Sequence, residues 1–99
     1  MLNRKYIEKI IVYFSDKPVI RGYLFGSYVR NEENENSDID ILLEIDYSQK
    51  VSLLDLIGWK LELEEILNRS IDLVAEDGLS KHIRPLIEKE KVLFYERAA

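Results

Sequence analysis

Three aspartates stand in apolar runs, in a pattern suited to binding a divalent cation. Asp38 and Asp40 are one residue apart in the run Asp-Ile-Asp-Ile-Leu-Leu-Glu-Ile, and Asp72 interrupts the later run Ile-Asp-Leu-Val-Ala. Because side chains alternate across a strand, Asp38 and Asp40 point to the same face, within roughly 7 Å of each other. Two bare carboxylates at that spacing repel, and a hard cation such as Mg²⁺ relieves the repulsion. The pair therefore predicts a magnesium site.

Asp72 can complete this site if its strand lies near that of Asp38 and Asp40. The apolar segment between the two runs is long enough for a crossover helix, which would make the two strands parallel. Three carboxylates can hold two metal ions about 3.5–4 Å apart, an arrangement that clamps the attacking and leaving oxygens in phosphoryl and nucleotidyl transfer. A separation of more than about 10 Å between Asp72 and Asp40 would exclude such a shared site.

An anion-binding site is predicted just before the aspartates. Gly26 and Ser27 precede a short helical or turn segment and can present backbone N–H groups to a phosphate. Arg30 is placed to add a positive charge. Each feature alone has an ordinary explanation, since Asp-x-Asp occurs by chance, Asp72 could face solvent, and Gly-Ser could be only a turn. Their order along the chain favours the catalytic interpretation.

Helices and strands that must position these residues alternate along the chain. Asn3 and Ser52 are predicted helix caps, the second with Asp55 in a capping box. The predicted elements are a helix ending near Phe14, a strand over Val19–Phe25, a strand over Asp38–Ile45, a helix to about Leu67, a strand over Ile71–Ala75, a helix from Ser80 to about Glu90, and a strand over Val92–Tyr95. Pro85 either kinks the helix from Ser80 or marks its true first turn. This order predicts one α/β domain over residues 1–99, with a small mixed sheet and helices packed mainly on one face.

Composition and charge narrow the classes of function. Hydrophobic residues make up 46% of the 99 residues, which is enough for a packed core. The formal net charge of −5 disfavours nonspecific binding to nucleic acid, because an acidic chain gains little from counterion release. Cysteine is absent, which fits a reducing cytoplasm. The sequence shows neither a membrane-spanning apolar run nor a signal peptide, so a cytoplasmic location is expected.

The motifs together resemble a known family of enzymes. Gly26-Ser27, Arg30 and Ser37-Asp38-Ile39-Asp40 resemble the signature of the polymerase-β-like nucleotidyltransferases. The short length and the segments 53–56, 71–74 and 92–95 resemble its minimal nucleotidyltransferase (MNT) branch. One position departs from the pattern, because the family often has glycine after the arginine and this chain has Asn31. Asparagine tolerates positive φ, so the turn is expected to keep its shape.

The resemblance implies a polymerase-β-like palm fold and specific residue roles. Asp38, Asp40 and Asp72 are implied as ligands of two Mg²⁺ ions, and Asp72 would also help to activate the attacking hydroxyl. Gly26 and Ser27 would hold the triphosphate of ATP. These roles agree with the chemistry that the residue types and their spacing indicate.

A protein partner is also implied by the resemblance. MNT domains of this type are often encoded beside a HEPN-domain partner, a helical ribonuclease toxin. The protein would then be an antitoxin that transfers AMP from ATP to a tyrosine of the toxin. Larger nucleotidyltransferases use an added helical domain to hold the acceptor, so here another protein or subunit is expected to hold it. The wide apolar surface of the helix ending near Leu67, including Trp59, is a candidate docking surface, although burial on two sides would explain it equally.

Other functions stay open at this point. The protein could neutralise its partner by occlusion alone, although three retained carboxylates favour chemistry. Transfer to a small molecule such as an aminoglycoside, or to an RNA end, is disfavoured by the small size and acidic charge. An Asp-x-Asp glycosyltransferase is a further alternative, but that class generally has a larger nucleotide-binding domain.

Overall fold

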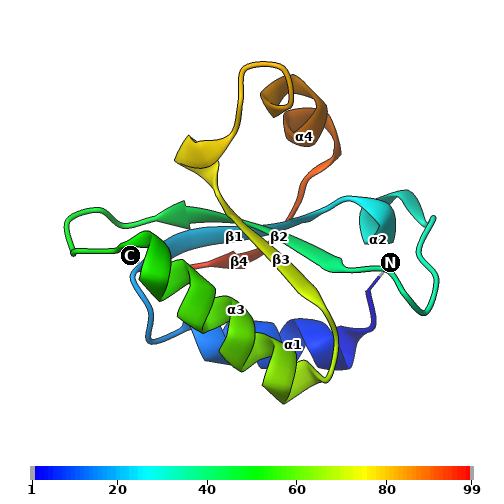
Figure 1. Cartoon of the computed structure of the whole chain (residues 1–99), viewed down its shortest axis with the longest axis horizontal. Coiled ribbons are helices and arrows are strands. Elements are labelled where there is room, and N and C mark those ends of the chain that lie inside the picture. Colours follow the sequence, from blue (N-terminus) through cyan, green and yellow to red (C-terminus); the bar gives the residue numbers. More distant parts are fainter. Residues whose placement is uncertain (1, 99) are drawn as a thin grey trace.

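A four-stranded mixed sheet forms the centre of the computed structural model, which describes residues 2–98 (Figure 1). The elements are α1 (Arg4–Phe14), β1 (Val19–Phe25), α2 (Ser27–Arg30), β2 (Ile39–Ile45), α3 (Leu53–Leu67), β3 (Ile71–Ala75), a 3₁₀ turn (Glu76–Gly78), α4 (Arg84–Glu90) and β4 (Val92–Glu96). The strand order is β3-β2-β1-β4. β1 is antiparallel to β2 and β4, whereas β2 and β3 are parallel. The crossover prediction for the helix between β2 and β3 is confirmed.

Local capping interactions set the ends of the helices, as the sequence predicts. The Asn3 side chain accepts a hydrogen bond from the Lys5 N–H, 2.8 Å away, at the start of α1. Ser52 and Asp55 form the reciprocal capping box of α3. Asn31 and Asn68 adopt left-handed conformations, with φ of 58° and 53°, at the ends of α2 and α3. Asn31 thus adopts the positive φ expected for a residue that takes the place of glycine at this turn.

α1 and α3 cover one face of the sheet and form the main core with it (Figure 1). Alternate residues of β2 face these helices, namely Ile39, Ile41, Leu43 and Ile45. Trp59 lies in this core, only 8% exposed, with its ring edge-on to Phe14 at 6.3 Å between centroids. Of the two interpretations left open for this helix, burial is therefore correct for Trp59, which belongs to no exposed docking surface.

The outer side of α3 nevertheless carries exposed apolar side chains. Leu54 is 77% exposed, and Leu53, Ile57 and Leu61 are exposed beside it. The wide apolar surface predicted for this helix thus has two parts, a buried side through Trp59, Leu63 and Leu67 and an unpartnered outer side.

α4 lies on the opposite face of the sheet from α1 and α3 (Figure 1). It begins at Arg84, later than the predicted start at Ser80, because residues 81–83 form a turn. Pro85 occupies the first turn of the helix, where a missing N–H is tolerated. Ile87 is the buried anchor of α4, and Glu90 is its last residue. α4 thus places Glu90 on the same side of the sheet as the predicted site.

No helix within residues 2–98 is both long enough and apolar enough to cross a membrane.

Candidate active site

The parallel pairing of β2 and β3 brings two of the predicted aspartates together. Asp40 and Asp72 are direct register partners in these strands. Because neighbouring strands lie about 4.8 Å apart and register partners point to the same face, their carboxylates share one side of the sheet. Asp38 immediately precedes β2 and lies two residues before Asp40. Asp40 and Asp72 thus share the face away from α1 and α3, and the charge of Asp38 acts on Asp40 from the residue just before β2.

The electrostatics of this site are unfavourable for three bare carboxylates. The pKa of Asp40 is raised from 3.8 to about 6, first by burial and then by the charges of Asp72 and Asp38. The nearby Arg30 guanidinium opposes this rise in the pKa of Asp40. Asp38 and Asp72 are exposed. The site thus holds excess negative charge that a bound cation would neutralise.

The side chains are not gathered into a coordination shell in this conformation. Within residues 2–98, no three Asp, Glu, His or Cys side chains are close enough together to hold a metal ion. The donor chemistry still fits Mg²⁺, which takes carboxylate oxygens and water. The backbone already places the three aspartates side by side, so side-chain rotation of the exposed Asp38 and Asp72 is the remaining movement.

We expect the buried, negatively surrounded carboxylate of Asp40 to contribute less to the stability of the metal-free protein as the pH rises. Between about pH 4 and pH 6 this group binds more protons in the folded protein than in the unfolded chain, because its pKa is raised on folding to about 6. The contribution of Asp40 to the free energy of unfolding should therefore fall as the pH rises through this window. In chelator at pH 7.5, Asp40→Asn should be about 1–2 kcal/mol more stable than wild type, a value reduced for partial exposure.

Urea unfolding of both proteins at pH 4.5 and pH 7.5 measures this difference. The advantage of Asp40→Asn should shrink at the lower pH, where the wild-type carboxyl is largely protonated. Asp38→Asn, which removes a more exposed charge, should gain less at pH 7.5. A destabilised Asp40→Asn at both pH values would mean that the carboxylate has a structural role instead.

Gly26 lies against Asp40 in a conformation that few other residues adopt. Its φ is +80°, and a Cβ atom added there would fall 2.0 Å from Oδ2 of Asp40. The glycine is needed for both reasons, because its backbone is left-handed and the carboxylate fills the space of a side chain. The Gly26 backbone therefore packs directly against the Asp40 carboxylate.

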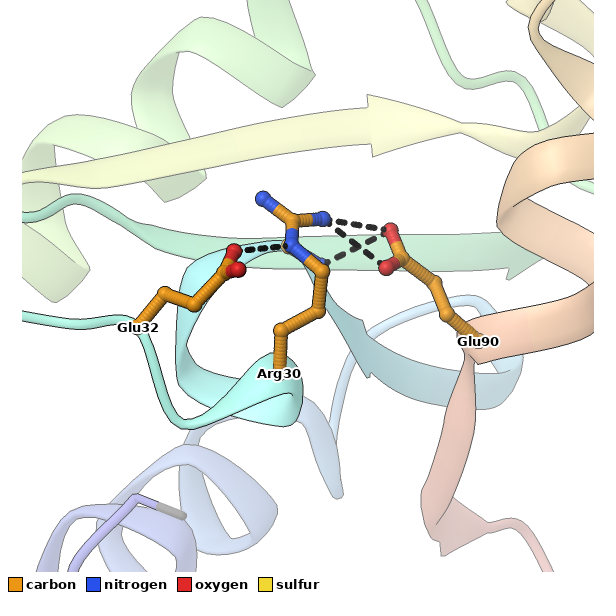
Figure 2. Close-up of polar contacts among 4 residues, drawn as sticks. Arg30, Glu32 and Glu90 are labelled. Carbon is orange, nitrogen blue, oxygen red and sulfur yellow. Dashed lines mark hydrogen bonds and ion pairs between the residues drawn. The ribbon is translucent and has the colours of Figure 1, made fainter.

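Arg30 reaches the same site but is held by two glutamates. Its Nε donates to Oε1 of Glu32 at 2.7 Å, and its Nη1 donates to both carboxylate oxygens of Glu90, at 2.8 and 3.1 Å (Figure 2). These contacts, Glu32 first, raise the pKa of Arg30, so the guanidinium stays charged. The predicted cation is thus present and is paired within the protein.

Glu90 is a residue of this site that sequence reasoning missed. Its Oε1 also accepts a hydrogen bond from the Gly26 N–H at 3.2 Å, across 64 residues of sequence. The sequence contained no signal for this contact, because Glu90 is one of several charged residues at the end of α4.

A cleft of about 490 Å³ joins these groups and opens beside α4. It is lined by Phe25, Gly26, Arg30, Asp40, Ile83, Leu86, Ile87 and Glu90. Tyr28, which lies in α2 between Gly26 and Arg30, does not line the cleft. Its side chain is buried in the core, and its hydroxyl accepts a hydrogen bond from Arg69. Its lining combines carboxylates and a cation with apolar side chains, so the cleft can receive a phosphorylated ligand with an apolar portion.

Comparison with known proteins places this geometry in a family. The sequence profile of the family described as "Polymerase beta, Nucleotidyltransferase" matches residues 8–99. A Methanocaldococcus jannaschii relative named "Putative protein adenylyltransferase" is 42% identical over 85 residues, which are 86% of this chain and 89% of the relative. Protein adenylyltransferase MntA of Thermococcus cleftensis is 41% identical over 69 residues, 70% of this chain and 68% of that protein.

Two solved structures have the same fold. One is a toxin–antitoxin complex with AMP-PNP, which matches with a TM-score of 0.76 and 23% identity over 96% of this chain and 74% of that chain. The other is the tri-AMPylated HEPN toxin of Shewanella oneidensis with its MNT antitoxin, with a TM-score of 0.73 and 20% identity over 96% of this chain and 73% of that chain. The profile match over residues 8–99 and the relative that is 42% identical show that this chain belongs to the polymerase beta nucleotidyltransferase family.

Proposed function

We propose that this protein is a Mg²⁺-dependent protein adenylyltransferase and the antitoxin of a HEPN-domain toxin. In this proposal it transfers AMP from ATP to a tyrosine hydroxyl of the toxin and so blocks its activity. The observation that carries the proposal is the pairing of Asp40 with Asp72 on adjacent strands, next to Gly26. The relatives named protein adenylyltransferases support the reaction, and the complex of an AMPylated HEPN toxin with an MNT antitoxin supports the partner.

Each residue of the site has a role in this reaction. Asp38, Asp40 and Asp72 would hold two Mg²⁺ ions, which supply charge stabilisation to the α-phosphate and to the leaving pyrophosphate. The Gly26 N–H, Ser27 and Arg30 would bind the triphosphate. The acceptor oxygen bonds to the α-phosphorus as the bond from that phosphorus to the bridging oxygen breaks. Asp72 is exposed at the site and would take the hydroxyl proton.

Labelled ATP tests the reaction directly. The purified protein is incubated with Mg²⁺, a lysate of its source cells, and ATP labelled at either the α- or the γ-phosphate. Adenylyl transfer puts label from the α-phosphate, and none from the γ-phosphate, onto one protein band. Label from the γ-phosphate alone would indicate a kinase, and no label in either case would contradict the proposal.

Asp72→Asn should separate catalysis from partner binding. We expect it to lower the rate of labelling about a hundredfold, because it removes both a metal ligand and the proton acceptor. Binding to the labelled partner, measured by co-purification, should persist, because the carboxylate serves the reaction rather than the interface. A partner that the wild-type protein has adenylylated should also stay inhibited after the wild-type protein is removed.

Occlusion without chemistry is the second candidate, favoured by the exposed apolar side of α3. In that case inhibition of the toxin would be proportional to the amount of complex formed. It would not need ATP, and the Asp72→Asn variant would inhibit as well as wild type. Leu54→Gln and Ile57→Gln are the informative variants, since both side chains are exposed. Trp59→Ala is unsuitable because it would leave a cavity in the core. The single-domain organisation over residues 1–99 and the cytoplasmic location stay predictions.

A further inference from the structure

The carboxylate of Glu90 sits where the phosphate-binding donors of the site converge. Its Oε1 accepts from the Gly26 N–H at 3.2 Å and from Nη1 of Arg30 at 3.1 Å, and its Oε2 accepts from the same Nη1 at 2.8 Å (Figure 2). One backbone N–H and one guanidinium directed at a single anionic oxygen form the same donor set that would bind a phosphate oxygen. The protein therefore supplies its own anion to this position.

The position of that anion relative to Asp40 makes simultaneous binding of a phosphate unfavourable. Glu90 and Asp40 line the same cleft, and Gly26 contacts both through its backbone. A triphosphate that approaches Asp40 would meet the Glu90 carboxylate at the donors it needs. Two anions cannot share the Gly26 N–H, so one must leave.

Glu90 is placed to leave without rearrangement of the fold. It is the last residue of α4, and its side chain is 22% exposed, so it can turn toward solvent. Its loss would free the Gly26 N–H and one side of the Arg30 guanidinium, while Glu32 would still hold Nε of Arg30. A neighbouring anchor, Ile87, keeps α4 on the sheet.

We propose that Glu90 is an internal competitor for the nucleotide, holding the triphosphate position with its carboxylate until ATP displaces it. The proposal rests on the phosphate-binding role of Gly26 and Arg30 in the function proposed above. It makes Glu90 a residue that sets the affinity for ATP. It also keeps the cationic side chain paired when no nucleotide is bound.

Binding of inorganic tripolyphosphate tests the proposal without any transfer reaction. Isothermal titration with excess Mg²⁺, which offsets the charges of the three aspartates, compares wild type with Glu90→Gln, Glu90→Ala and the control Glu32→Gln. Both Glu90 variants should bind about fivefold more tightly, the effect expected for release of one partly exposed ion pair. Glu32→Gln removes the same charge from Arg30 but does not touch Gly26, so its gain should be clearly smaller.

The Gly26 amide gives an independent structural readout. In the ¹⁵N-labelled protein, Glu90→Gln and tripolyphosphate should each shift the Gly26 amide resonance, whereas Glu32→Gln should leave it nearly unchanged. Circular dichroism establishes that each variant is folded. Glu90→Gln keeps the size of the side chain and serves if Glu90→Ala does not fold.

Three outcomes would overturn the proposal. Weaker binding by the Glu90 variants would mean that Glu90 positions Arg30 for the ligand instead of competing with it. Equal gains in Glu32→Gln and Glu90→Gln would indicate a general charge effect. Failure of the folded Glu90 variants to bind tripolyphosphate would show that the donors occupied by the Glu90 carboxylate do not bind phosphate. If tripolyphosphate binds as expected but no adenylyl group is transferred, the proposed function fails and the competitor role stands.

Discussion

Asp40→Asn should lower the rate of adenylyl transfer by at least about a thousandfold, the loss expected when a metal-binding carboxylate is neutralised. Asp40 is central to the site for geometric reasons. It pairs in register with Asp72, lies two residues after Asp38, and contacts the Gly26 backbone. The fold should persist, because within residues 2–98 the Asp40 side chain makes no hydrogen bond or ion pair, and because burial and the charges of Asp72 and Asp38 disfavour its charged form.

Transfer of label from the α-phosphate of ATP to the partner measures this effect, and Glu44→Gln is the matched control. Glu44 lies on the same strand and the same face as Asp40, but it pairs with Arg21 away from the site. Glu44→Gln should retain activity within a few-fold of wild type. An active Asp40→Asn, or an equal loss in Glu44→Gln, would remove the metal-site interpretation.

Gly26→Ala should also abolish transfer, by about a thousandfold, because it displaces the same carboxylate by steric means. The new methyl carbon would lie 2.0 Å from Oδ2 and 2.9 Å from Cγ of Asp40, so one of the two groups must move. Alanine is also strained at a φ of +80°. We therefore expect a loss of stability of about 1–3 kcal/mol in addition to the loss of activity.

Gly78→Ala provides the control for this prediction. A Cβ atom added at Gly78 meets nothing within 4 Å, so both stability and transfer should stay close to wild type. Thermal unfolding and the labelling assay measure the two quantities. A Gly26→Ala protein that keeps wild-type activity would show that Asp40 need not remain where the structure places it.

Much of the fold follows from interactions between residues close together in the sequence. Asn3, Asn68 and the Ser52–Asp55 pair act on backbone groups no more than four residues away, so the sequence alone predicted where α1 begins and where α3 begins and ends. The alternation of side chains likewise put Asp38 and Asp40 on one face. The crossover rule then required β2 and β3 to be parallel, which made the encounter of Asp40 with Asp72 predictable.

The remaining features depend on how distant elements pack. The sequence determined the family motif, the caps and the shared face of Asp38 and Asp40. Tertiary structure alone decided that Trp59 turns inward against Phe14 while Leu54 stays exposed, because both sides of α3 are apolar and only the position of the sheet distinguishes them. It also decided that Glu90 reaches Gly26 and Arg30. Glu90 is 60 residues from Arg30 and 64 residues from Gly26 in the sequence. The contacts exist only because α4 crosses the face of the sheet that α1 and α3 leave open.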